Sequence, residues 1–234
     1  MQIKHVPIVN THYWLALIIA SIFGANTGDY LSDTLGLGHI NGLPLLLVLF
    51  VFVLIAERFD KIQHVAYYWA AIIIARISAT NIGDIFHDFH ISFLISIPCV
   101  AATLLLVVLL WRFTIVDYVS NQLQTNGFYW VSMLLAGTLG TLVGDYFSFP
   151  LGFGNLYATL FLGAVLVMIF FIGRKINLDW LAYFWLVVVL IRSAGTSAGD
   201  YFAHHLFGLP VSTLITGILF IGFLVFGHKI FSNK

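Results

Sequence analysis

Charged residues are scarce in this sequence. Only ten Lys and Arg and ten Asp and Glu occur among 234 residues, so charged residues make up 9% of the chain, against about 25% in soluble domains. A soluble protein of this size needs far more polar side chains to cover its surface. The shortage excludes an ordinary soluble enzyme and a disordered regulator, and the zero net charge argues against nucleic acid as a partner.

Cysteine is nearly absent too. The single cysteine, Cys99, excludes an intrachain disulfide and a metal cluster held by thiolates. A cleavable signal peptide is also missing from the pattern, because the first apolar run continues past residue 25 without a cleavage site and a following soluble domain. We therefore expect this run to be retained as the first membrane span.

Apolar residues are abundant instead, at 61% of the chain, and the mean hydropathy is +1.01. A helix needs about 20 mostly apolar residues to cross the hydrocarbon core of a bilayer. The sequence therefore predicts an all-α integral membrane protein, with the lipid bilayer as its surroundings and no room for a soluble domain. Eight apolar runs predict eight transmembrane helices, at about 13–34, 43–57, 65–87, 91–112, 128–149, 155–173, 180–203 and 209–227.

The basic residues predict the orientation of these spans. The loops near 34–43, 88–91, 149–155 and 203–209 contain no Lys or Arg. Cytoplasmic loops of membrane proteins carry an excess of Lys and Arg, so both termini are expected in the cytoplasm. Eight basic residues lie in the tails and the other loops, namely Lys4, Arg58, Lys61, Arg112, Arg174, Lys175, Lys229 and Lys234.

The main signal is a fourfold internal repeat. In every copy a Trp precedes the Asp of a Gly-Asp pair by 15 residues, and the Asp residues are spaced by 55, 61 and 55. Copies one and three are thus 116 residues apart, as are copies two and four, which predicts two halves, 1–116 and 117–234, of four spans each. Because every unit holds two spans, the copies enter the membrane from the same side and are related by rotation about its normal. The units are Trp14 to Gly28-Asp29, Trp69 to Gly83-Asp84, Trp130 to Gly144-Asp145, and Trp185 to Gly199-Asp200.

These four Trp–Gly–Asp frames resemble a bacterial family of multi-pass membrane proteins of unknown function. That family is built from four tandem two-helix repeats, each with a characteristic tryptophan. The resemblance covers nearly the whole chain and implies a bacterial inner membrane location. It implies no activity and no catalytic residues.

The intramembrane charges predict a central site. A charged side chain at the centre of a span costs at least about 2.5–3.5 kcal/mol, so such groups are expected to face the bundle interior. The first helices of the four repeats should then line the centre, with the more apolar second helices outside. Each Arg is expected to reach a carboxylate, because it keeps its charge. The predicted central residues are Asp29, Asp84, Asp145, Asp200, Arg76, Arg192, Thr80 and Thr196.

The other repeated residues have structural interpretations. The glycines before each Asp, which are Gly28, Gly83, Gly144 and Gly199, are expected to break the helices or to permit close packing. In the first case the Asp would act only as an N-cap. The four tryptophans, Trp14, Trp69, Trp130 and Trp185, are expected to anchor the helices at the membrane interface.

A second polar cluster follows the repeat Asp residues. His and Asp without Cys suit Zn, Mn, Ni or Fe better than Cu(I). The cluster is therefore a candidate site for a divalent metal ion, although the spacing is only a weak motif. Its members are Asp33, Asp88, His87, His90 and His204.

Three functions fit these features. The first is transport, of a metal cation or a proton-coupled small solute, because a ring of carboxylates at one depth is typical of cation pathways. The second is a membrane binding or sensor protein without flux. The third is an intramembrane hydrolase in which two Asp share a proton, although no two of the four Asp stand out and no nucleophile motif is present. We therefore expect a transporter and not an enzyme.

Overall fold

The computed structural model describes residues 6–59, 64–114, 125–173 and 179–231. Within these ranges all regular secondary structure is helical, and eight helices are each long and apolar enough to cross a membrane. The chain is a multi-pass membrane protein, as predicted. The helices are α1 (Thr11–Asp29), α2 (His39–Phe59), α3 (Ala66–Asp88), α4 (Phe93–Thr114), α5 (Gly127–Ser148), α6 (Gly154–Gly173), α7 (Trp180–Tyr201) and α8 (Leu209–Phe231).

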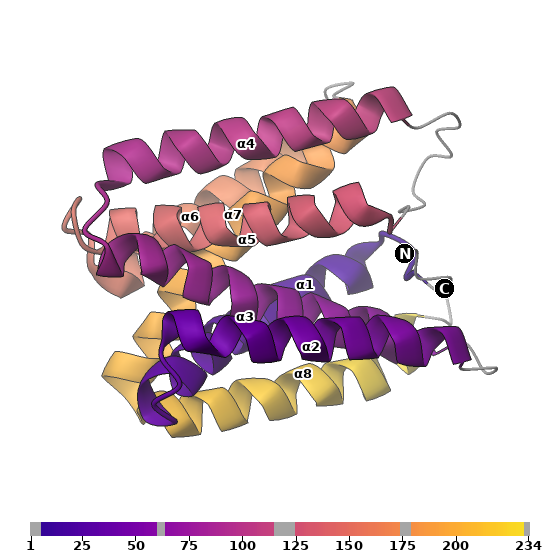
Figure 1. Cartoon of the computed structure of the whole chain (residues 1–234), viewed down its shortest axis with the longest axis horizontal. Coiled ribbons are helices and arrows are strands. Elements are labelled where there is room, and N and C mark those ends of the chain that lie inside the picture. The colour runs from indigo at the N-terminus through magenta and orange to yellow at the C-terminus, as the bar shows by residue number, and fades with distance from the viewer. Residues whose placement is uncertain (1–5, 60–63, 115–124, 174–178, 232–234) are drawn as a thin grey trace.

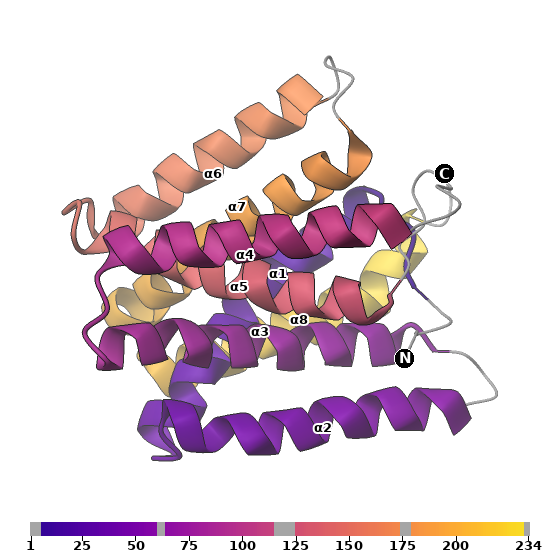
Figure 2. The same ribbon diagram turned by 45° about the horizontal axis from the view of Figure 1, so that its top comes forward.

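Two short π-helical segments lengthen the spans of the first and fourth repeats. The segment η1 (Tyr30–Thr34) continues α1, and η2 (Phe202–Phe207) continues α7. The second span, α2, begins at His39, before its predicted start at residue 43, because polar residues take part in its first turn. In both views α1 begins and α8 ends at the same end of the bundle (Figures 1 and 2).

The helices form an inner ring and an outer layer. The ring runs α1, α3, α5, α7 and back to α1, and each outer helix packs on the inner helix of the next repeat: α2 on α3, α4 on α5, α6 on α7 and α8 on α1. In an apolar stretch of 18 residues from each span, 50 to 67% of the residues are buried in the inner helices, against 17 to 22% in the outer helices. The first helices of the repeats therefore line the centre, and the outer helices present their apolar faces to the membrane.

Small residues permit the close approach of the inner helices. A Cβ atom added to Gly24 would lie 2.5 Å from Arg76 Cγ, and one added to Gly140 would overlap Arg192 Cβ. These two contacts are related by the offset of 116 residues, which also relates the contact of Gly137 with Ala79 to that of Gly195 with Ser21. The packing thus follows the twofold repeat of the sequence.

The glycines before the repeat Asp residues pack helices together and do not break them. Gly28 adjoins Thr80 and Gly83 adjoins Thr141, while helical structure continues through all four Gly-Asp pairs. The interpretation of Asp as an N-cap therefore needs correction. Asp29 is the last residue of α1 and precedes η1 without a side-chain capping bond, and Asp84, Asp145 and Asp200 lie within helices.

The repeat tryptophans form part of the core of the bundle, and their role as anchors at the membrane interface stays a prediction. Trp69, Trp130 and Trp185 are only 3, 7 and 4% exposed, and Trp14 is half-buried. Each Trp lies between the preceding inner helix and the outer helix that packs on it; Trp130, for example, contacts Tyr68 of α3 and Phe50 of α2. The outer layer covers these rings, so they hold the bundle together at the end where α1 begins.

Candidate functional site

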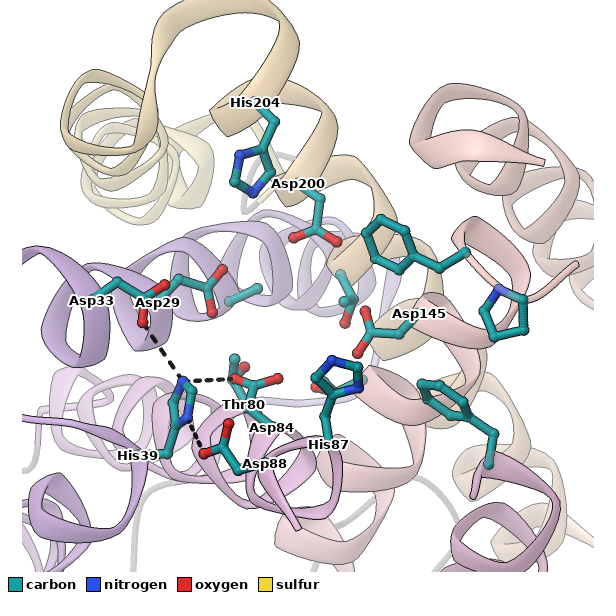
Figure 3. A pocket seen from close by; sticks show the side chains of 16 residues that line it. Asp29, Asp33, His39, Thr80, Asp84, His87, Asp88, Asp145, Asp200 and His204 are labelled. Atoms are coloured by element: carbon teal, nitrogen blue, oxygen red, sulfur yellow. Dashed lines mark hydrogen bonds and ion pairs between the residues drawn. The ribbon is translucent and has the colours of Figure 1, made fainter. Parts of the chain in front are cut away.

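A cavity of about 600 Å³ lies at the end of the bundle where the inner helices finish. All four repeat Asp residues line it, one from each inner helix, and Figure 3 shows their carboxylates reaching into it from different sides. We call Asp29, Asp84, Asp145 and Asp200 the Asp ring. The side chains of Asp33 and Asp88 at the rim are 65 and 51% exposed, so the cavity is open at this end.

The floor of the cavity repeats the same register one turn deeper. Four residues before each ring Asp, or about 6 Å along the helix, the lining residues are Ala25, Thr80, Thr141 and Thr196. We call these four residues the Thr floor. Below the carboxylates the cavity is thus lined by three threonine hydroxyls and one methyl group. The methyl group belongs to Ala25, so the first repeat is the copy that lacks a hydroxyl at this position.

Arg76 lies beneath the Thr floor and closes the centre of the bundle. It is fully buried, and it donates hydrogen bonds to the Thr141 hydroxyl at 2.9 Å and the Thr196 hydroxyl at 2.6 Å. Its other bonds go to the backbone carbonyls of Ser21, at 3.3 Å, and Gly137, at 3.5 Å. The guanidinium on α3 therefore bonds to all three other inner helices, and it interacts electrostatically with all four carboxylates of the Asp ring.

The expected ion pairs of the two arginines need correction. Among the described residues, no carboxylate lies within 4.0 Å of Arg76 or Arg192. Eight residues separate each Arg from the Asp of its own repeat, or about 12 Å along the helix. Hydroxyls and carbonyls of neighbouring helices lie nearer to Arg76 than any carboxylate does, and they accept its hydrogen bonds.

Arg192 occupies the equivalent position in the fourth repeat but has other surroundings. It is fully buried, and its Nη2 lies 3.5 Å from the sulfur of Met133. Its Nε and Nη1 have no hydrogen-bond partner among the described residues. Its electrostatic neighbours are Arg76 and the tyrosines 13, 68 and 129. Arg192 therefore faces away from the Asp ring, while Arg76 faces toward it.

Those tyrosines close the axis further toward the end where α1 begins. The Tyr13 and Tyr68 hydroxyls lie 2.9 Å apart, and the Tyr68 and Tyr129 hydroxyls 2.5 Å apart. All three side chains are fully buried, and Phe184 takes the matching position in the fourth repeat. The centre of the bundle thus has an open acidic end and an end closed by an arginine and aromatic rings.

His39 organises the polar rim of the cavity. Its ring nitrogens lie 2.7 Å from Asp88, 3.7 Å from Asp33 and 3.8 Å from Asp84, as the dashed lines in Figure 3 mark. His39 on α2 thereby joins η1 to α3. The sequence places His39 near the predicted outer cluster but not among its members, because only the path of the chain from η1 to α2 brings its ring to the acids.

The predicted metal site needs correction. In the described part of the chain, no group of three or more His, Cys, Asp or Glu is arranged to hold a metal ion. Asp33 and Asp88 are engaged by His39, while His87 and His204 line separate sides of the cavity (Figure 3). His90, at φ 55°, lies in the exposed turn after α3 and is not a lining residue of the cavity.

Thr141 was also missed, although the sequence contained a signal for it. Thr80 and Thr196 were identified because they share a repeat with an Arg. Thr141 has the same position four residues before its Asp, but in a repeat that lacks the Arg. A comparison of the residue four positions before the Asp in all four repeats identifies Thr141, and it shows that the first repeat has Ala25 there instead of a threonine.

Comparison with known proteins supports the repeat. A model of the family described as Repeat of Unknown Function (DUF347) matches residues 12–62, 128–175 and 183–230. Each matched segment covers most or all of one inner helix and the outer helix that follows it. The segment with α3 and α4 lies outside the matches but carries the same frame from Trp69 to Gly83-Asp84. No curated protein and no solved structure matches the chain significantly.

Proposed function

We propose that the chain, which belongs to the DUF347 repeat family because the family model matches more than half of it, is a transporter that moves a cation through its central acidic cavity. The observation that carries the proposal is the order of groups along the axis. An open ring of four carboxylates leads to the Thr floor, and a guanidinium bonded to three helices closes the way beyond it.

The charge of the site favours a cation. With all four carboxylates of the Asp ring ionised, Arg76 and Arg192 leave a net charge of minus two. Rings of carboxylates attract cations and are typical of cation pathways. The cavity holds about 600 Å³, whereas a water molecule takes about 30 Å³ in the liquid. A metal cation with its hydration shell therefore fits, as does a small solute whose uptake is coupled to protons.

The closed end favours a carrier over an open channel. Arg76 and the buried tyrosines occupy the axis below the cavity. A cation bound at the Asp ring competes with Arg76 for the negative charge of the carboxylates, which provides a physical link between binding and the position of the arginine. Transport then requires Arg76 to leave the axis while the outer opening closes.

The basic residues support an orientation in the bacterial inner membrane with cytoplasmic termini. In this orientation the cavity opens to the outside of the cell. An aspartyl hydrolase would need two carboxylates set apart from the others to share a proton, and the common register of the Asp ring does not favour that. A sensor would bind the cation without moving it, and flux measurements separate the two.

The test is flux in proteoliposomes made with the purified protein. Uptake of Mn²⁺, Ca²⁺, K⁺ and protons is measured for the wild type and for Asn substitutions of each residue of the Asp ring. Asp179→Asn is the matched control, because Asp179 lies outside the cavity and caps α7, and Asn caps about as well. We expect the ring variants to fold but to lose flux, while the control keeps it. Wild-type flux in all four ring variants, or cation binding without flux in the wild type, contradicts the proposal.

A further inference from the structure

The two buried arginines are equivalent in sequence but not in structure. Arg76 and Arg192 are 116 residues apart, and each adjoins a glycine of the preceding repeat, Gly24 or Gly140. Arg76 nevertheless makes four hydrogen bonds near the axis, whereas Arg192 makes one contact to a sulfur atom. One repeat therefore breaks the symmetry that the rest of the packing keeps.

The hydrogen-bond acceptors of Arg76 have symmetry mates. Shifting by 116 residues exchanges the Ser21 and Gly137 carbonyls with each other and converts Thr196 into Thr80. The Thr80 hydroxyl is buried and has no hydrogen-bond partner among the described residues. An arginine in the symmetry-related position would therefore find both carbonyls and an unused hydroxyl.

The fourth hydrogen-bond acceptor of Arg76 has no counterpart in the other half of the chain. Thr141, which accepts from Arg76 at 2.9 Å, corresponds to Ala25, which has no hydroxyl. Arg192 would thus have one hydrogen bond fewer than Arg76 in the same environment. A hydrogen bond from a charged donor is worth about 1.5–3 kcal/mol, which is enough to decide which arginine occupies the axis.

The two arginines exclude each other from this position. Both would use the Ser21 and Gly137 carbonyls, and two like charges close together in a buried site repel strongly. The Nε and Nη1 of Arg192 are buried and have no hydrogen-bond partner among the described residues. A buried charge with unmet hydrogen bonds is costly, so Arg192 gains by moving to the axis whenever Arg76 leaves it.

We infer that Arg76 and Arg192 are alternative occupants of one axial guanidinium site, and that Thr141, opposite Ala25, selects Arg76. Thr141 and Ala25 are therefore positioning residues. One guanidinium at a time occupies the axis beneath the Asp ring, so the axis opens only when both arginines have left it. The inference concerns which side chain closes the centre, and it holds whether or not the protein transports a cation.

A double-mutant cycle tests the exchange. Thermal unfolding in detergent is measured for the full chain with Arg76→Gln, Arg192→Gln and both substitutions. If Arg192 takes over the axial site, Arg76→Gln lowers the unfolding temperature slightly, Arg192→Gln leaves it unchanged or raises it because a costly buried charge is removed, and the double variant loses more than the sum of the two. A double variant no less stable than Arg76→Gln alone overturns the inference.

Ala25→Thr gives a second test, which stands even if the double variant fails to fold. Ala25 lines the cavity at the position that Thr141 holds in the other half of the chain, and a Cβ added to Gly199 would lie 3.5 Å from the Ala25 Cβ. The substitution supplies the missing hydroxyl to Arg192 only, so it should return Arg76→Gln to the unfolding temperature of the wild type. The control is Ala25→Thr in the wild type, where Arg76 already holds the site and no gain is expected. No recovery of Arg76→Gln, or an equal gain in the wild type, overturns the role of Thr141.

Discussion

The Arg76 guanidinium on α3 donates a hydrogen bond to the Thr196 hydroxyl on α7, 2.6 Å away. The two helices face each other diagonally in the inner ring, and both side chains are buried, at 0 and 3% exposure. The bond therefore crosses the centre of the protein. It joins the first half of the chain to the second, and its position beneath the Asp ring makes the floor of the cavity part of the structural core.

Removing this bond should destabilise the protein. Thr196→Val keeps the shape of the side chain but leaves a charged donor without its acceptor, which should cost about 1.5–3 kcal/mol. Thr103→Val is the control, because Thr103 is exposed and its hydroxyl bonds only the backbone of its own helix. Thermal unfolding in detergent measures both variants. Equal stability of the two would show that the bond contributes little.

Close packing at Gly24 should tolerate no added methyl group. In Gly24→Ala the new Cβ would lie 2.5 Å from Arg76 Cγ and 2.8 Å from its Cβ. Helices α1 and α3 must then separate or Arg76 must shift, at a cost of about 1–3 kcal/mol.

The matched control is Gly163→Ala on the outer helix α6, where nothing in the described structure lies within 4 Å of the added Cβ. There the gain in helix propensity should stabilise the protein by up to about 1 kcal/mol. The two substitutions are thus expected to change the unfolding temperature in opposite directions. A stabilising Gly24→Ala would contradict the packing described for the inner ring.

The buried tyrosine chain should depend on its middle member. Tyr68→Phe keeps the ring but removes the hydroxyl that bonds both Tyr13 and Tyr129. Two buried hydroxyls then lose a partner, which should cost about 1–3 kcal/mol each. Phe184 occupies the matching position in the fourth repeat. A phenylalanine ring therefore packs at this position of the repeat, and the cost of Tyr68→Phe should come from the lost hydroxyl.

Tyr157→Phe is the control for this substitution, because that side chain is 67% exposed. The unfolding temperature of Tyr157→Phe should equal that of the wild type. A loss confined to Tyr68→Phe assigns the effect to the buried hydroxyls, and equal behaviour of the two variants would argue against it.

The helical architecture was predictable because its signals are strong and repeated. The apolar runs exceed the length of a soluble core helix, and the spacing of Asp29, Asp84, Asp145 and Asp200 placed one acid at the same register of each inner helix. A cost of several kcal/mol for a charge in lipid then directed these acids inward. The cavity brings the four together on that basis.

The spacing of residues in the sequence does not predict the direction of each side chain in the site or its contacts with other helices. Arg76 and Arg192 start at the same depth, and their long side chains turn in opposite directions according to the hydroxyls nearby. The burial of Trp130 depends on α2, the outer helix that precedes it by a whole repeat. His39 meets the rim acids through the fold of η1 and α2. Such contacts follow from the packing of whole helices.

The orientation of the bundle is the last prediction. Asn41 is exposed in the first turn of α2, at the end that carries the cavity, and Ile8 is 68% exposed at the opposite end. Single cysteines are introduced at each position in a chain with Cys99→Ser, since Cys99 is the only native thiol.

A maleimide that cannot cross membranes should label Asn41→Cys in intact cells and Ile8→Cys only after permeabilisation. The reason is the absence of Lys and Arg from the connections at the cavity end, which favours the outside of the membrane for that end. The reverse pattern would place the Asp ring on the cytoplasmic side. The cation would then bind from the cytoplasm, and the direction of loading in the flux assay would have to be reversed.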